Sequence, residues 1–241
     1  MLLINGLTKT YGRKKAVDNV SLHVMPGDIY GFIGHNGAGK TTTIKSCCGL
    51  LRFDEGEIFI NGESLAESPM RCKKALAYIP DNPELYDYMT GIKYLNFVCD
   101  VYKIPHSVRK NNIQMYSELF GLKDYLGQNM GTYSHGTKQK ILIVSALVHN
   151  PQLLIMDEPF VGLDPIASYN LKVVMRGICN SGGAIFFSTH VLDVAEKLCN
   201  KIAIIKDGRI VVAGDTEYIR GDRSLENVFL ELEGKDVLGT Y

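Results

Sequence analysis

The sequence predicts an α/β fold with a mostly parallel sheet, and two features of its pattern carry that prediction. Short apolar runs recur with helix-length spacers in the C-terminal half, at 153–156, 184–188, 202–205 and 210–213. Strands that are apolar along their whole length are typical of a parallel sheet covered by helices. The middle of the chain, 90–148, instead repeats apolar residues at helical spacing. We therefore expect a helical insertion in an α/β core.

The N-terminal part is predicted to form strands at 2–7, 16–24 and 29–33. The segment 56–62 alternates apolar and polar residues and ends in Asn-Gly, a hairpin signal. These elements predict an N-terminal antiparallel β-subdomain. No repeat or Pro/Ser-rich linker divides the chain, so we expect a single domain over 1–241, with a helical subdomain at about 86–148 inserted in the core.

Composition excludes several classes of protein. The 241 residues are 46% apolar and 22% charged, which argues against disorder as the main state, and the formal net charge is zero. A balanced charge argues against nucleic acid as a partner. The longest apolar run, 141–148, is too short to span a membrane, and the start lacks the pattern of a signal peptide. We expect a cytoplasmic protein with six reduced, buried cysteines.

A glycine-rich segment carries the strongest functional signal. It fits the pattern G-x-x-x-x-G-K-[ST] and lies between the predicted strand 29–33 and a predicted helix at 41–51, the context that the motif requires. Such a loop turns successive N–H groups toward phosphates, so the sequence predicts a P-loop NTPase core. Lys40 is expected to reach the β- and γ-phosphates of ATP, and the Thr41 hydroxyl to bind Mg²⁺. The residues expected to bind the nucleotide here are Gly34, His35, Asn36, Gly37, Ala38, Gly39, Lys40, Thr41 and Thr42.

Two carboxylates follow the apolar run 153–156. A P-loop NTPase needs an aspartate at such a position to hold Mg²⁺, and Asp157 fits that need. Glu158 would face the γ-phosphate as the general base or as the group that polarises the attacking water. An apolar strand that ends in acids is by itself more often a strand that runs into solvent. The phosphate loop favours the functional interpretation.

The order of these features resembles the ATPase subunit of ABC transporters, from residue 3 to about 234. In that family an aromatic residue stacks on adenine, and Tyr11 matches it; the alternative is an ordinary tyrosine of a β-sheet. His190 matches the switch histidine that contacts the γ-phosphate, although a lone histidine after a strand is more often structural. The segment 224–232 looks like the tail of subunits that serve drug and lipid exporters.

The family's signature motif, LSGGQ, is expected just before the Asp-Glu strand, where the sequence has 133–140, YSHGTKQK. Only Ser134 and Gly136 match its core letters, because His135 replaces a glycine and Thr137 the glutamine. The resemblance implies a head-to-tail dimer, with a homodimer preferred, in which this segment contacts the γ-phosphate of ATP held by the opposite chain. Residues 162–164, GLD, resemble the family's D-loop.

A second departure concerns Asp81, which follows the predicted strand 75–79 and stands where the family has a glutamine that touches Mg²⁺ and the attacking water. An aspartate there could bind Mg²⁺ directly, or its charge could repel the γ-phosphate. A third interpretation is that the loop engages only when a partner positions it. A protonated His135 would add a positive charge near the same phosphate.

The resemblance implies a subunit that hydrolyses ATP and drives a separate membrane-spanning subunit, from the cytosolic face of the membrane. The segment 90–148 would carry the groove that receives this partner. Export is the preferred direction and import the second. A soluble ABC ATPase acting on DNA, ribosomes or cluster assembly is the alternative. Against it stand the single cassette, the neutral charge and the lack of a long coiled-coil insertion.

Overall fold

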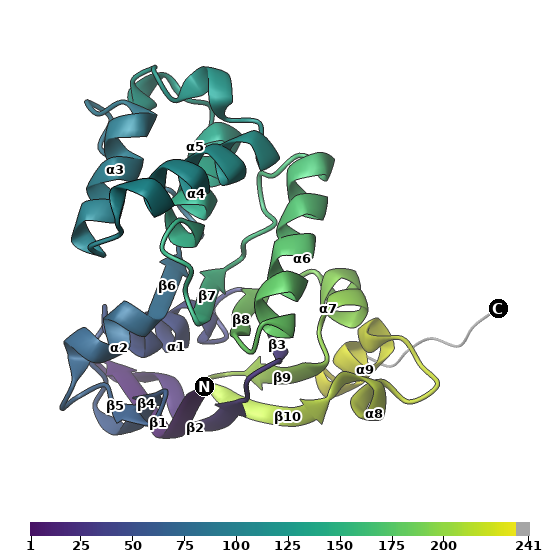
Figure 1. Cartoon of the computed structure of the whole chain (residues 1–241). Helices are drawn as coiled ribbons and strands as arrows, with labels where there is room; N and C mark the ends of the chain where they lie inside the picture. Colours follow the sequence, from purple (N-terminus) through teal and green to yellow (C-terminus); the bar gives the residue numbers. More distant parts are fainter. Residues whose placement is uncertain (235–241) are drawn as a thin grey trace.

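The N-terminal strands form an antiparallel sheet in the computed structural model, which describes residues 1–234 (Figure 1). Its strand order is β2-β1-β4-β5. The strands are β1 (Leu2–Tyr11), β2 (Lys14–Val24), β4 (Glu55–Ile60) and β5 (Glu63–Ser64). Leu2 of β1 lies opposite Val24 on one side and Ile60 on the other, and all three side chains are buried. The predicted antiparallel subdomain is confirmed.

A second sheet forms the centre of the molecule, in the order β10-β9-β3-β8-β7-β6. Its strands are β3 (Ile29–Ile33), β6 (Leu76–Ile79), β7 (Leu153–Asp157), β8 (Ala184–Thr189), β9 (Lys201–Lys206) and β10 (Arg209–Asp215). All neighbours are parallel except β9 and β10. Every residue of β3, β7 and β8 is buried, as expected of strands covered on both faces. The mostly parallel sheet is confirmed.

Helices cover both faces of the central sheet and divide the core. Helix α1 (Lys40–Cys47) contacts β1 and β2 as well as β7 and β8, so it lies between the two sheets. The other face of the central sheet packs on α6 (Pro165–Asn180) and α7 (Leu192–Leu198). The remaining C-terminal helices are α8 (Thr216–Arg220) and α9 (Leu225–Leu232).

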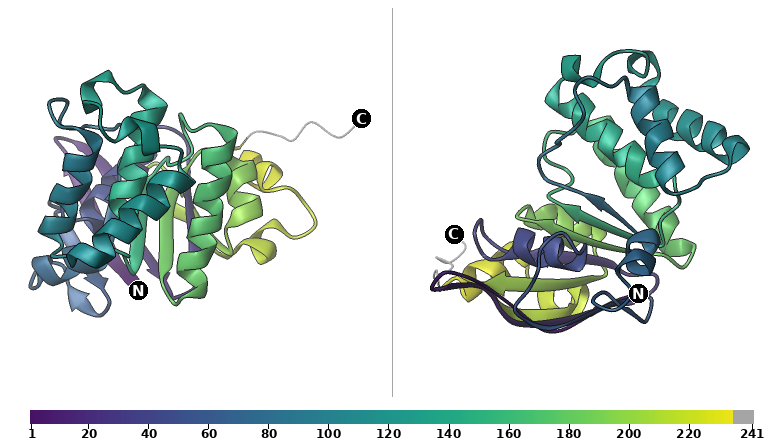
Figure 2. Two further views of the ribbon diagram at one scale, coloured as in Figure 1. Left: turned by 45° about the horizontal axis from the view of Figure 1, so that its top comes forward. Right: turned by 90° about the vertical axis from the view of Figure 1, so that its left-hand side faces the viewer.

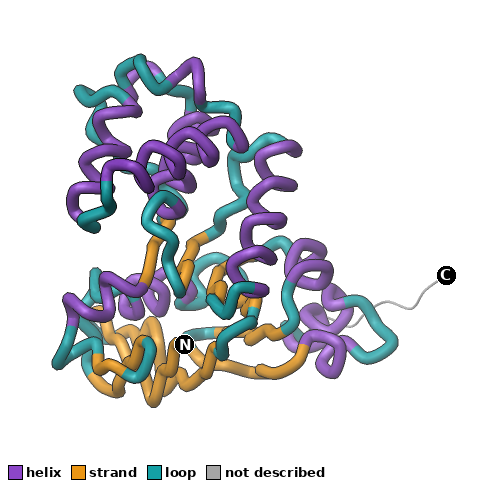
Figure 3. Tube along the Cα trace, viewed as in Figure 1, coloured by secondary structure: helices purple, strands orange, loops and turns teal. Residues whose placement is uncertain are grey.

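A helical lobe, defined here as residues 91–147, lies between β6 and β7 in the sequence, extends beyond the central sheet (Figure 2) and contacts β6 through its helix α5. It contains α3 (Gly91–Val101), α4 (His106–Leu119) and α5 (His135–Leu147), with short 3₁₀ turns at Lys123–Tyr125 and Met130–Thr132. Figure 3 shows in teal the loops that connect this lobe to the sheet. Residues 235–241, the end of the expected domain, lie outside the described residues.

Some predicted boundaries were wrong. The first helix was expected to reach residue 51 but ends at Cys47, and Gly49 follows with a φ of 63°, a left-handed conformation that stops a helix. Ala75 was expected to start a strand, yet it ends helix α2 (Pro69–Ala75), and β6 begins at Leu76. None of the described helices has the length and apolar character needed to cross a membrane.

Candidate active site

The glycine-rich loop, 34–39, connects β3 to α1 at the carboxyl end of the central sheet. Two of its glycines are required by geometry. A Cβ on Gly34 would lie 2.5 Å from the carbonyl oxygen of Ile205, and Gly39 has a φ of 113°. Only a residue without a Cβ fits the close approach at Gly34, and glycine adopts the left-handed backbone of Gly39 without strain. The loop therefore wraps tightly around the N-terminus of α1, where free N–H groups can bind an anion.

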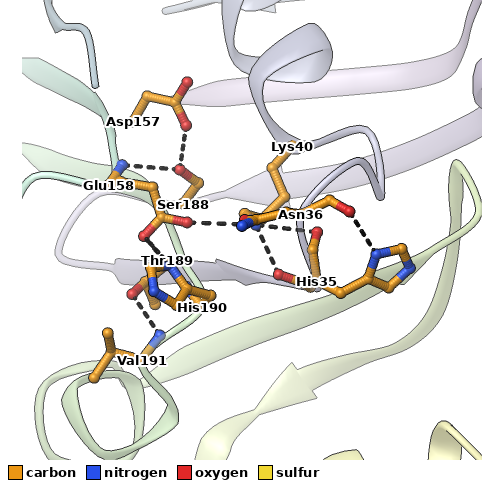
Figure 4. Close-up of polar contacts among 10 residues, drawn as sticks. His35, Asn36, Lys40, Asp157, Glu158, Ser188, Thr189, His190 and Val191 are labelled. Carbon is orange, nitrogen blue, oxygen red and sulfur yellow. Dashed lines mark hydrogen bonds and ion pairs between the residues drawn. The ribbon is translucent and has the colours of Figure 1, made fainter. Parts of the chain in front are cut away.

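Lys40 is the first residue of α1 and only 6% exposed. Its ammonium donates to the carbonyl oxygens of Gly34 at 2.7 Å and His35 at 3.3 Å, and it lies 3.4 Å from Oε1 of Glu158 (Figure 4). The contact with Glu158 is an ion pair without a hydrogen bond, so Oε1 of Glu158 is buried and accepts no hydrogen bond within residues 1–234. A buried positive charge is thereby fixed beneath the loop.

Strand register brings the two predicted carboxylates beside β8. Asp157, the last residue of β7, is paired in the parallel ladder with Ser188 of β8. The Ser188 hydroxyl donates to Oδ1 of Asp157 at 2.5 Å, and the backbone N–H of Glu158 donates to the Ser188 hydroxyl at 3.0 Å. Glu158 has a φ of 48°, which is uncommon for a residue with a Cβ. Our sequence interpretation did not include Ser188.

His190 and Lys40 hold the Glu158 carboxylate from two sides. Nδ1 of His190 lies 3.0 Å from Oε2 of Glu158, and the backbone N–H of His190 donates to the same oxygen at 3.3 Å. Lys40 faces the other oxygen, as Figure 4 shows. The carboxylate is largely buried, whereas the imidazole is half exposed. This arrangement places a proton acceptor between two positive or proton-donating groups, directly beside the phosphate loop.

A cavity of about 440 Å³ opens next to these residues, and Thr41, Asp81 and Asp157 line it together with Lys45, Leu50, Tyr78, Pro80, Asn82 and Glu84. Hydroxyl and carboxylate oxygens are hard ligands that suit Mg²⁺. Among residues 1–234 no group of three or more His, Cys, Asp or Glu side chains is placed to hold a metal ion. The residues therefore fit a Mg²⁺ ion whose other ligands are water and nucleotide phosphates, as is usual for this ion.

Asp81 lies in an unfavourable electrostatic environment. Partial burial, followed by the negative charges of Asp157 and Glu158, raises the pKa of its carboxyl group, and His135 and His190 oppose this shift. The carboxylate thus contributes negative charge to a cavity that already holds Asp157. Both the direct Mg²⁺ contact and the repulsion of a phosphate fit its position.

Tyr11 ends β1 and is 51% exposed. The Lys9 ammonium lies 5.6 Å from the centre of its ring, and Lys9 is itself fixed by Asp54 at 3.0 Å. A tyrosine that packed inside the sheet would be buried. The ring is accessible, which stacking on an adenine base would require.

The predicted signature residues lie apart from this cluster, at the start of α5. Ser134 caps the helix, because its hydroxyl accepts from the N–H of Thr137 at 3.2 Å. Ser134 and His135 are exposed, and within residues 1–234 no hydrogen bond or ion pair joins 134–136 to the phosphate loop. His135 packs on Gly162, where a Cβ would lie 2.7 Å from Cδ2 of the imidazole. The structure therefore joins the signature segment to 162–164.

The comparisons with known proteins agree with these observations. A family model described as "ABC transporter" matches residues 17–161. The chain is 33% identical over 241 residues to the ABC-type transporter ATP-binding protein EcsA of Bacillus subtilis, covering 98% of each chain. It is 36% identical to the bacitracin transport ATP-binding protein BcrA of Bacillus licheniformis, over 85% of this chain and 66% of that one. It is 32% identical to the linearmycin resistance ATP-binding protein LnrL of Bacillus subtilis, over 89% and 69%.

The chain spans 98% of the length of EcsA and 66% of the length of BcrA. It spans 62% of the length of an uncharacterized ABC transporter ATP-binding protein of Nostoc. Among solved structures, an ATP-binding subunit of an ABC transporter has a TM-score of 0.93 at 34% identity, covering 97% of this chain and 99% of that one. The ATP-binding cassette MJ0796, solved as a dimer in a post-hydrolysis state with ADP and Pi, has a TM-score of 0.82. At 20% identity over 90% of this chain and 99% of its own, it supports the fold alone.

Proposed function

The chain belongs to the ABC transporter family as an ATP-binding subunit with ATPase activity, and from that premise we propose that two copies bind ATP head to tail and drive a separate membrane exporter. The observation that carries the proposal is the Glu158 carboxylate, held between Lys40 and His190 beside the phosphate loop. Three segments that are distant in the sequence meet there: the start of α1, the residue after β7 and the residues after β8.

The proposed chemistry follows from these contacts. The loop N–H groups and Lys40 bind the β- and γ-phosphates, and the Tyr11 ring stacks on adenine. Thr41 and Asp157, with Asp81 beside them, would hold Mg²⁺, which neutralises phosphate charge. A γ-phosphate between Lys40 and Glu158 separates this ion pair, so that Glu158 is free to accept a proton from the attacking water. His190 orients the carboxylate and contacts the same phosphate.

A second copy of the chain completes the site. Ser134 and His135 are exposed and Gly136 is partly exposed at the N-terminus of α5, where they can donate to a phosphate bound by another chain. MJ0796, a cassette of the same fold, was solved as a dimer, which supports the pairing of two copies. Loss of the γ-phosphate charge would weaken the contact, and the dimer would open.

The membrane partner is proposed to bind at the helical lobe, which would place the chain peripherally on the cytosolic face. Tyr86 and Tyr88, which precede the lobe, form a cluster with Phe97 of α3, with ring centroids 6.0 and 6.3 Å from that of Tyr86, and all three are exposed. A cluster of exposed aromatic rings is typical of a surface that binds another protein. The relatives BcrA and LnrL, named for bacitracin transport and linearmycin resistance, support export.

Co-expression tests this proposal. The chain should pellet with membranes only when the membrane protein that co-purifies with it is present, and Tyr88→Ala should reduce that association. Tyr218→Ala, which removes an 89% exposed ring from α8, is the matched control. Binding to DNA or ribosomes without any membrane protein would contradict the proposal and favour the soluble alternative.

A further inference from the structure

Ser188 connects the two acidic residues of the candidate site, through the carboxylate of Asp157 and the backbone of Glu158. Its side chain is fully buried. It donates to Asp157 at 2.5 Å and accepts from the backbone N–H of Glu158 at 3.0 Å, as Figure 4 shows. It stands at the end of β8, paired in register with Asp157.

The direction of these two hydrogen bonds is fixed by chemistry. The backbone N–H of Glu158 can only donate, so the Ser188 oxygen must accept there. The single hydroxyl hydrogen then points to Oδ1 of Asp157, whose ionised carboxylate can only accept. Oδ1 is occupied in this way, which leaves the other oxygen of Asp157 for the cavity that Thr41 and Asp81 also line.

The second bond constrains the backbone at the proposed base. Glu158 has a left-handed φ of 48°, which is unfavourable for a residue with a Cβ and persists only where neighbouring contacts hold it. Its N–H donates to the Ser188 hydroxyl, at the point where β7 and β8 lie side by side. The direction of the Glu158 side chain toward Lys40 and His190 depends on that backbone conformation.

We propose that Ser188 is a positioning residue that sets both carboxylates at once: it presents one oxygen of Asp157 to Mg²⁺ and holds Glu158 in the conformation that aims it at the γ-phosphate. This inference rests on the roles proposed above for Asp157 and Glu158. An alanine at this position removes both bonds and leaves a carboxylate oxygen and an N–H without their partner.

The test compares Ser188→Ala and Ser188→Thr with Ser145→Ala. Ser145 is a matched control because it is also buried and its hydroxyl also donates a hydrogen bond, to the carbonyl oxygen of Leu142 at 2.8 Å, within α5. ATP affinity is titrated with Mg²⁺ and with EDTA for each variant, and phosphate release is measured in parallel. A general loss of stability would lower the affinity for ATP both with Mg²⁺ and with EDTA. A loss at the Mg²⁺ site lowers only the affinity with Mg²⁺.

For Ser188→Ala we expect the Mg²⁺-dependent gain in affinity to fall by about 10-fold, the size of one hydrogen bond to a charged group, and the affinity in EDTA to stay unchanged. Turnover should fall by at least as much. Ser188→Thr keeps the hydroxyl and should restore both. If Ser188→Ala retains the Mg²⁺-dependent gain and the turnover of Ser145→Ala, the positioning role is wrong.

The variant Glu158→Gln separates this inference from the proposed function. If Glu158→Gln abolishes hydrolysis and Ser188→Ala does not change it, only the role of Ser188 fails. If Glu158→Gln hydrolyses ATP at the wild-type rate, the proposed base is wrong and the role of Ser188 toward it fails as well. A circular-dichroism melt of each variant confirms that it is folded. If Ser188→Ala is not folded, Ser188→Cys takes its place, because cysteine is of similar size but is a weak donor.

Discussion

The two halves of the proposed ATP site differ in how their side chains are held. In the core half, Lys40, Asp157, Glu158 and His190 lie at the carboxyl ends of neighbouring strands and bond to one another or to Ser188. In the signature half, Ser134 and its neighbours are exposed at the end of a helix on the lobe. Strand register assembles the first half within one chain, whereas the second half faces outward and is available to another molecule.

In the core half the Lys40 ammonium already has partners within its own chain. It donates hydrogen bonds to two carbonyl oxygens and forms an ion pair with Glu158. Phosphates that enter must therefore replace the ion pair between Lys40 and Glu158. No such competition exists at Ser134, where the only partner of the hydroxyl within residues 1–234 is its own helix turn.

The largest expected effect is at the base in the core half. Glu158→Gln keeps the shape of the side chain but cannot accept a proton, so turnover should fall by about 10²-fold or more while ATP still binds. The dimer with ATP should then accumulate on a sizing column. Hydrolysis near the wild-type rate would show that the core half works without this carboxylate.

The next effect concerns the adenine side of the core half. Tyr11→Ala removes one stacked ring, about 1–3 kcal/mol, so the Kd for ATP should rise roughly 5- to 150-fold. GTP should lose nearly as much, because stacking tolerates different bases. Tyr218→Ala, the control, should change neither value, and an unchanged ATP affinity in Tyr11→Ala would return Tyr11 to an ordinary sheet residue.

Asp81 is expected to limit turnover until a partner positions its loop. We expect low phosphate release from the isolated subunit, a several-fold rise in the complex with its membrane partner, and a further gain in Asp81→Gln if its charge is the brake. Steady-state phosphate release from the subunit and the complex, with and without the substitution, measures this. A wild-type subunit that already works at the rate of the complex would contradict gating and leave Asp81 as a Mg²⁺ ligand.

The same residue predicts a pH dependence of stability. Because the pKa of Asp81 is raised in the folded protein, the folded state binds its proton more tightly than the unfolded state. The protonated form stabilises the fold at low pH, and this contribution is lost as pH rises through the folded pKa. Asp81→Asn should therefore raise the Tm at pH 7, with a gain that shrinks toward pH 4. A gain that is equal at both pH values, or equal in the exposed control Asp222→Asn, would contradict this cause.

The smallest effect is expected on the lobe. Lys138 lies 2.9 Å from Asp87, but the Asp87 side chain is 65% exposed, so water screens the pair. Lys138→Met should change the free energy of unfolding by less than about 1 kcal/mol, as measured by urea titration. A larger loss would mean that the lobe is held together at the signature segment by charge, contrary to the contrast drawn with the core half.

The sequence predicted the parts of the fold that local pattern determines. The strand 29–33 was correct at both ends, because the glycine loop fixes where it stops. Helix α6 was not predicted, although Asp164 before Pro165 is a start signal, and the structure shows Asp164 capping the N–H of Ala167 at 2.8 Å. The sequence therefore contained the start signal of α6.

Other features depend on pairing that no local pattern contains. Ser188 became part of the site only because β7 and β8 run side by side in register, which places it against Asp157. The packing of His135 on Gly162 likewise joins the start of α5 to the loop between β7 and α6. The structure gives the positions and partners of Tyr11, Ser134 and His190. Their roles toward ATP remain predictions.

The central claim is that each ATP site combines the core half of one chain with the signature half of another. It is tested by mixing two variants, Lys40→Ala, with a defective phosphate loop, and Ser134→Arg, with a defective signature. Each alone should lack ATPase activity. Their mixed dimer contains one site with both halves intact, so phosphate release should reappear on mixing. If Ser134→Arg hydrolyses ATP alone, or if the mixture stays as inactive as its components, the two-chain site is contradicted.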